Sequence, residues 1–190
     1  MTVQTPEKLY TPDEYLDLEE KAEFRSEYSN GRIIPMTGGT TNHNRITRNL
    51  CTALTVGLKG QDFEVFVVDV KVWIPNSQKF RYPDLMVVSG QPRYYNDRKT
   101  TITNPQVVIE VLSDSTEEFD RDEKFLLYQS LPTFQEYVLI KQDQISITHY
   151  YKTGAKSWNI RQYDAQDLEL EFRSFDLKVA IADLYEKVEF

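Results

Sequence analysis

Apolar residues recur at helical spacing in four parts of the chain. In the longest of these, His43 shares a stripe with Ile46 and Leu50, which places the histidine at the first turn, facing inward. Capping boxes precede two of the others, at Thr11 to Glu14 and at Ser115 to Glu118. Helices are therefore expected over residues 11–19, 42–59, about 117–130 and 181–185.

Runs of apolar and β-branched residues between these helices predict strands. Residues 107–112 have almost no polar face, which is typical of a central strand. A hairpin is expected over 24–36 with its turn at Ser29-Asn30-Gly31, and residues 63–74 fit either one long bent strand or a pair. Residues 89–104 lack a core pattern and are expected to form a loop. Further strands are predicted over 82–88, 136–140, 145–151, 157–163 and 168–175.

This order of elements predicts an α/β fold with a central mixed sheet flanked by helices. The length of 190 residues fits one domain over 1–190, and no internal repeat or linker divides it. Its core is expected at about 40–141, with an N-terminal helix and hairpin over 10–36 and extra antiparallel strands over 144–190.

Composition narrows the choice of partners and compartment. Cys51 is the single cysteine, which excludes an internal disulfide and fits a cytoplasmic protein. No apolar run approaches the about 18 residues of a membrane span, so no membrane partner is expected. The net charge of −8 argues against nucleic acid, but residues 28–61 and 144–163 contain no acid. These two segments could form a locally positive face, or their basic residues could simply be scattered over the solvated surface. The basic residues considered for contact with nucleic acid are Arg45, Arg48, Lys152 and Lys156.

Two carboxylates stand in runs that otherwise read as buried strands. Asp84 precedes an apolar run, and Glu110 lies among aliphatic residues. Strand alternation places Glu110 on one face with Leu112, and neighbouring strands in register would bring the two carboxylates together. A buried carboxylate is costly without a positive partner, and Mg²⁺ takes one or two carboxylates with other oxygens. The sequence therefore predicts a Mg²⁺ site, with Mn²⁺ as a substitute, on Asp84, Glu110 and a main-chain carbonyl such as that of Val111.

Lys124 begins a helical stripe that continues through Leu127 and Tyr128. Because that stripe must face the sheet, the amine of Lys124 is predicted within hydrogen-bonding or ion-pair distance of the Asp84 or Glu110 carboxylate. Structural roles remain open. Asp84 could cap a turn, Glu110 could belong to a structural pair, and Lys124 could pair only with Asp120 one turn earlier.

These residues carry a resemblance to a known family. The segments 82–84, 108–113 and 120–128, with Glu27 to Gly31 and Pro132 to Val138, resemble the Uma-type restriction endonuclease family of the PD-(D/E)XK nuclease superfamily over roughly residues 10–185. The resemblance implies the superfamily core, Mg²⁺, phosphodiester hydrolysis, and Asp84 and Glu110 as metal ligands.

The chain departs from the superfamily pattern at one position. That pattern has a lysine two residues after the glutamate on the same strand, where this chain has Leu112. The resemblance implies that the lysine has moved to the following helix as Lys124. In an endonuclease of this kind, His43 and Glu27 are expected as supporting members of the site. Leu112 is then expected to pack as a hydrophobic neighbour.

Hypotheses from different classes follow. The first is a metal-dependent endonuclease, with DNA favoured over RNA as its substrate. The second is a non-catalytic binding module on the same fold, acting as a homodimer, which the net acidity and the moved lysine favour. A third takes Asp84 and Glu110 as the acid and base of a glycosidase, although carboxylates beside a lysine suit phosphate better than sugar.

Overall fold

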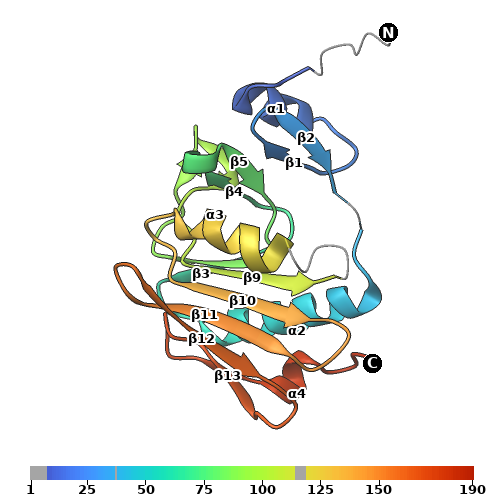
Figure 1. Ribbon diagram of the computed structural model, residues 1–190, viewed down its shortest axis with the longest axis vertical. Coiled ribbons are helices and arrows are strands. Elements are labelled where there is room, and N and C mark those ends of the chain that lie inside the picture. The colour runs from blue at the N-terminus through green and yellow to red at the C-terminus, as the bar shows by residue number, and fades with distance from the viewer. Residues whose placement is uncertain (1–7, 37, 114–118) are drawn as a thin grey trace.

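The computed structural model describes residues 8–36, 38–113 and 119–190. Within these ranges the strands form two six-stranded sheets and one two-stranded sheet, with helices packed against them (Figure 1). This arrangement confirms the expected α/β fold class with mixed sheets and an additional C-terminal antiparallel portion.

The main sheet has the order β12-β11-β10-β9-β6-β3, in which β9 and β10 run parallel and the other neighbours antiparallel. All six residues of β9 are buried, which confirms the expected central strand. The strands of the main sheet are β3 (Phe63–Val67), β6 (Leu85–Ser89), β9 (Val107–Leu112), β10 (Glu136–Lys141), β11 (Ile147–Gly154) and β12 (Ser157–Tyr163).

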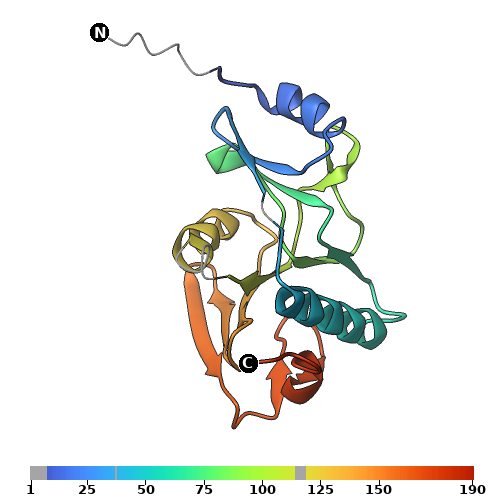
Figure 2. The ribbon, with the colours of Figure 1, turned by 90° about the vertical axis from the view of Figure 1, so that its right-hand side faces the viewer.

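Helices cover both faces of this sheet. On one face, Ile46 and Leu50 of α2 (Thr41–Gly57) pack against Ile109, together with α4 (Ile181–Leu184). On the other face, Tyr128 of α3 (Phe125–Gln129) packs against Val108. Figure 2 shows α2 and α3 on opposite sides of the strands. No helix within the described ranges is long and apolar enough to cross a membrane.

The N-terminal sheet has the order β2-β1-β5-β4-β8-β7. The predicted hairpin forms its edge, and its turn residues Asn30 and Gly31 both have positive φ, as a type I′ hairpin turn requires. Helix α1 (Pro12–Glu19) begins at the predicted capping box and buries Tyr15 against Phe80. The strands are β1 (Ser26–Ser29), β2 (Arg32–Pro35), β4 (Lys71–Ile74), β5 (Lys79–Arg81), β7 (Tyr94–Tyr95) and β8 (Arg98–Ile102).

Of the two interpretations of residues 63–74, the pair is correct, and its strands β3 and β4 lie in different sheets. Other expected boundaries were wrong. The expected strand over 82–88 begins only at Leu85, because residues 82–84 connect β5 to β6. The 3₁₀ helix η1 (Pro75–Ser77) precedes β5. Residues 89–104 contain β7 and β8 and bury Ile102, so they are not a structureless loop.

Two further elements differ from expectation. The helix predicted over 117–130 is observed as the π-helix η2 (Phe119–Lys124) followed by α3, and its expected capping box at 115–118 lies outside the described residues. The strand expected over 168–175 is limited to β13 (Glu169–Glu171), which pairs with the unexpected β14 (Lys178–Ala180).

Candidate active site

Asp84 lies where the chain passes from the N-terminal sheet into the main sheet. It directly precedes Leu85, which is paired with Ile109 of β9. Asp84 Oδ2 accepts a hydrogen bond from the main-chain N–H of Val111 at 2.7 Å, so the aspartate lies beside the residue that follows Glu110. Asp84 therefore lies beside β9, which carries Glu110, although it belongs to the connection before β6 and not to a strand as expected.

Glu110 points to the face of the main sheet that α3 covers. It is 3% exposed, and its Oε1 accepts hydrogen bonds from Tyr128 Oη at 3.2 Å and from Lys124 Nζ at 3.1 Å. Burial raises the pKa of Glu110 well above its ordinary value of 4.5; Lys124 opposes this rise, and the charges of Asp120 and Asp84 add to it. Burial is thus the main reason why the charged form of Glu110 is disfavoured.

Lys124 is the last residue of η2, and its amine is held between two buried carboxylates. Its Nζ lies 3.1 Å from Glu110 Oε1 and 2.7 Å from Asp120 Oδ1. Burial alone would lower the pKa of Lys124, but the charges of Glu110 and Asp120 more than offset it, so the amine stays cationic. The predicted distance between Lys124 and a site carboxylate is confirmed. Leu112 is buried beside Tyr128, as expected for a hydrophobic neighbour.

His43 reaches Asp84 from the other face of the main sheet. The hydroxyl of Thr40 caps α2 by accepting a hydrogen bond from the N–H of His43, which places the imidazole in the first turn. Its Nε2 lies 3.1 Å from the Asp84 carboxylate. Burial lowers the pKa of His43, but the hydrogen bond and the charge of Asp84 raise it by more, so the net pKa is above 6.5. The expected inward orientation of His43 is confirmed.

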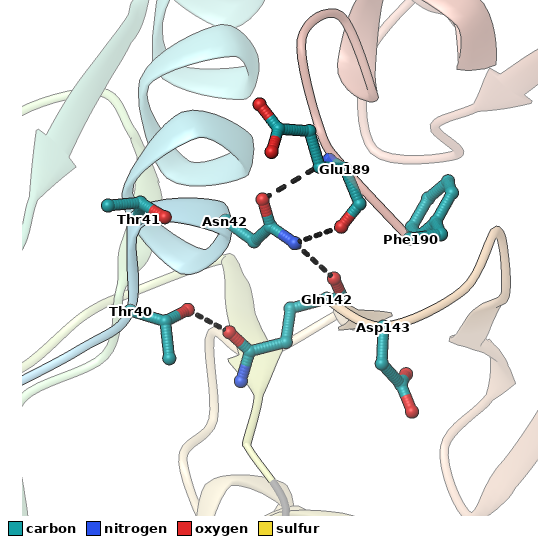
Figure 3. Close-up of a pocket in the computed structure, with 7 residues that line it drawn as sticks. All are labelled: Thr40, Thr41, Asn42, Gln142, Asp143, Glu189 and Phe190. Carbon is teal, nitrogen blue, oxygen red and sulfur yellow. Dashed lines mark hydrogen bonds between the residues drawn. The ribbon is translucent and has the colours of Figure 1, made fainter.

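Hydrogen bonds across a pocket of about 310 Å³ hold the start of α2 in place (Figure 3). Asn42 Nδ2 donates to the main-chain oxygens of Gln142 at 3.3 Å and Glu189 at 2.7 Å, and the Thr40 hydroxyl donates to the Gln142 side chain. These bonds hold the first turn of α2 and thereby fix the position of His43. The lining contains none of the predicted site residues and consists of Thr40, Thr41, Asn42, Gln142, Asp143, Glu189 and Phe190.

Glu27 of β1 is bonded to the segment that precedes Asp84. Its Oε2 accepts a hydrogen bond from Arg81 at 2.9 Å, and its Oε1 accepts one from the Tyr82 N–H at 3.1 Å. Its charge also contributes to the raised pKa of Lys124, after those of Glu110 and Asp120. Glu27 is therefore near the site, with both oxygens engaged by Arg81 and Tyr82.

Asp120 and Tyr128 complete the buried cluster around Lys124 and Glu110. The sequence identified Asp120 only as a partner of Lys124, four residues later, yet it is 2% exposed and its charge helps to raise the pKa of Glu110. The i,i+4 spacing between Asp120 and Lys124 could have identified Asp120 as a residue of the site. A carboxylate on a buried stripe needs an opposite charge as much as a buried lysine does.

The donor atoms suit a hard divalent cation. Asp84 and Glu110 offer carboxylate oxygens, which are the ligand type that Mg²⁺ prefers. Within residues 8–36, 38–113 and 119–190, no three acidic, histidine or cysteine side chains already form a metal cage. Mg²⁺ does not require one, because it commonly keeps several waters and one or two carboxylates.

Comparison with known proteins assigns the family. The family described as Uma2, "Putative restriction endonuclease", matches residues 12–182. The chain belongs to this family. That membership confirms the resemblance drawn from the sequence and supports a nuclease-like function.

Two curated relatives of this Uma2 chain come from Synechocystis sp. (strain ATCC 27184 / PCC 6803 / Kazusa). "Uncharacterized protein sll1609" is 38% identical over 172 residues, covering 90% of this chain and 97% of the relative. "Uncharacterized protein slr1290" is 40% identical over 182 residues, covering 95% of this chain and 93% of the relative. The similarity therefore extends over nearly the full length of these Uma2-like proteins.

A solved structure shares the fold. The crystal structure of a putative nuclease belonging to DUF820 from Anabaena variabilis ATCC 29413 superposes with a TM-score of 0.72 and 22% identity, covering 93% of this chain and 97% of the other. At this level of identity the comparison supports the fold of the Uma2 chain.

Proposed function

We propose that this protein is a divalent-metal-dependent endonuclease that hydrolyses phosphodiester bonds in DNA. The observation that carries the proposal is the position of the Lys124 amine, 3.1 Å from Glu110 Oε1 on the strand next to Asp84. Three separate segments of the chain bring two carboxylates and a lysine together, which is the set that phosphate chemistry with a bound cation needs.

The metal ligands in this proposal are Asp84, Glu110 and the main-chain carbonyl of Val111. Restriction-endonuclease-like families generally use divalent metals. When bound there, Mg²⁺ or Mn²⁺ would polarise the scissile phosphate and lower the pKa of an attacking water.

The remaining groups act on the water and on the phosphate charge. Lys124 orients the attacking water and stabilises the negative charge that develops on the phosphoryl oxygens. The Tyr128 hydroxyl donates a hydrogen bond to Glu110 and fixes that carboxylate. His43 is hydrogen-bonded to Asp84 and holds its orientation, while Glu27 supports the segment before Asp84.

DNA is proposed to contact the acid-free segments. Arg48 on α2 and Lys156 beside β12 are exposed, so both are available to phosphates. Arg45 and Lys152 are half-buried, and Arg45 lies 3.4 Å from Glu189, so their phosphate contacts would be secondary.

A homodimeric binding protein without catalysis is the competing hypothesis. The observation that favours it is that both carboxylates nearest to Lys124 already accept its amine, as in a structural ion pair. Metal binding and cleavage distinguish the two hypotheses directly.

The test combines Mn²⁺ titration by calorimetry with Mg²⁺-dependent cleavage of supercoiled plasmid DNA. Asp84→Asn and Glu110→Gln should abolish both, and Lys124→Met should abolish cleavage alone. Matched controls are Asp122→Asn, Glu123→Gln and Lys99→Met, which remove the same charges from exposed positions and should change neither result. Wild-type protein that binds no Mn²⁺ at millimolar concentration and cleaves no DNA would favour the binding protein.

A further inference from the structure

Residues 63–74 and 79–89 form one antiparallel ribbon that crosses from the main sheet into the N-terminal sheet. In the main sheet Val67 is paired with Leu85, and in the N-terminal sheet Val72 is paired with Arg81. Residues 68–71 on one strand therefore face residues 82–84 on the other. The first strand carries one extra residue at the crossing, which is a β-bulge.

Val68 has the backbone conformation that accommodates this extra residue. Its φ is +57°, and the N–H of Asp69 donates to the carbonyl of Val67 at 2.7 Å, which closes a three-residue turn around Val68. Such a turn with positive φ at its centre is rare and strained, and a β-branched residue is unusual there. Val68 is 44% exposed, so burial of its side chain does not account for the choice of residue.

The strained turn is bonded directly to the main chain of Asp84. The N–H of Val68 donates to the Asp84 carbonyl at 3.0 Å, which is the last main-chain bond of the ribbon before the crossing. Strained backbone persists where the surrounding structure over-determines it, and such positions cluster at functional sites.

The departure of the ribbon explains why the Asp84 side chain lies where it does. β6 pairs with β9 only from Leu85 onwards, opposite Ile109, so the strand has left the sheet at the level of Val111. The N–H of Val111 is bonded there to Asp84 Oδ2. The carboxylate thus lies near the carboxyl end of β9, between His43 on one face and Glu110 on the other.

We propose that the one-residue bulge at Val68 is the positioning element of the site. By turning the ribbon out of the main sheet immediately before Leu85, it directs the Asp84 carboxylate to the end of β9. Val68 is a positioning residue, because it acts through the main chain of Asp84 and has no contact with reacting atoms. The metal-binding part of its test rests on the proposed function, whereas the hydrogen-exchange part does not.

The test compares deletion of Val68 with Val68→Gly, which restores the extra residue with one that adopts positive φ freely. Amide hydrogen exchange of Val111 reports the bond to Asp84, with Asp84→Ala as the reference for its loss. The deletion should speed this exchange by at least about tenfold, as expected for a lost bond to a charged acceptor. It should also weaken Mn²⁺ binding by about tenfold or more. Val68→Gly should match the wild type in both measurements.

Thermal unfolding keeps the proposal testable even if the deletion variant does not fold. Val68→Gly should unfold at the wild-type temperature or above it, because glycine relieves the positive φ, while Val67→Gly in the regular strand should unfold at a lower temperature. A folded deletion variant with unchanged Val111 exchange would overturn the proposal, and so would a loss for Val68→Gly equal to that for Val67→Gly. Wild-type protein that binds no Mn²⁺ would instead refute the proposed function and leave the exchange result to decide this inference.

Discussion

Replacement of Lys124 by methionine tests whether the amine is held inside the carboxylate cluster. Methionine keeps the length of the side chain and removes its charge. Glu110 and Asp120 are 3% and 2% exposed, so both carboxylates would lose their cation while remaining buried. Removing one partner of a buried ion pair costs about 3–5 kcal/mol, and we expect a loss of stability in this range at pH 8.

The loss should depend on pH in a defined direction. The folded-state pKa of Glu110 already lies above 4.5, with burial as the largest cause, and it rises further when Lys124 is removed. A carboxyl group with a raised folded pKa contributes most stability below its unfolded pKa, and that contribution is lost as pH rises towards the folded pKa. Lys124→Met should therefore come closer to the wild type as the pH falls from 8 towards 5.

Urea unfolding monitored by circular dichroism at both pH values measures these differences. Glu110→Gln combined with Asp120→Asn and Lys124→Met should recover most of the loss, because no charge is then left buried without a partner. Lys99→Met on the exposed part of β8 should stay within about 0.5 kcal/mol of the wild type. A loss below about 1 kcal/mol for Lys124→Met would match an exposed ion pair and refute the buried cluster.

Three further predictions concern other parts of the molecule. The carboxylate of Glu136 accepts hydrogen bonds from the N–H groups of Arg173 and Ser174 and pairs with His149. Burial raises the pKa of Glu136, but these contacts lower it by more, so the net pKa lies below 4.5. The stability that the contacts contribute is therefore present above pH 4.5 and is lost as pH falls through the folded pKa. Glu136→Gln should cost about 1.5–3 kcal/mol at pH 7 and flatten the acid limb of a urea-unfolding series. Leu112→Lys in the Lys124→Ala background should restore part of the plasmid cleavage, and the absence of any recovery would show that the strand position cannot reach the phosphate. DNA affinity measured across a salt series should weaken, with a slope smaller by about one, on alanine replacement of Arg48 or Lys156, and should weaken less on replacement of Arg45 or Lys152.

The sequence predicted those elements whose residues are buried in a regular pattern. β9 was recognisable because apolar residues fill it on both faces, and that same uniformity made Glu110 conspicuous. α2 was recognisable from its buried stripe. β7 and β8 escaped because they are short and mostly polar; in β8 only Thr101 and Ile102 are buried, where the strand pairs with β4.

The crossing at residues 82–84 could not be recognised from hydrophobicity. Tyr82 is buried and Leu85 to Val88 are apolar, so the pattern continues through a point where the chain changes sheets. Pro83 was the available signal, because proline has no N–H to donate and is disfavoured inside a paired strand. The bulge at Val68 carries no sequence signal, since valine is an unfavourable residue for positive φ.

In the superfamily pattern, spacing along one strand brings the lysine to the glutamate. In this chain, the packing of a helix against the sheet brings Lys124 to Glu110. A lysine two residues after the glutamate on one strand would share its face through strand geometry alone. Lys124 instead belongs to η2, and this π-helix is held by Tyr137, whose hydroxyl donates to the Asp120 carbonyl at 2.9 Å. Phe125, the next residue, packs on Tyr150 with ring centroids 4.3 Å apart. Aromatic contacts to β10 and β11 therefore deliver the lysine to Glu110, so the carboxylates belong to the sheet and the amine belongs to a helix that docks on it.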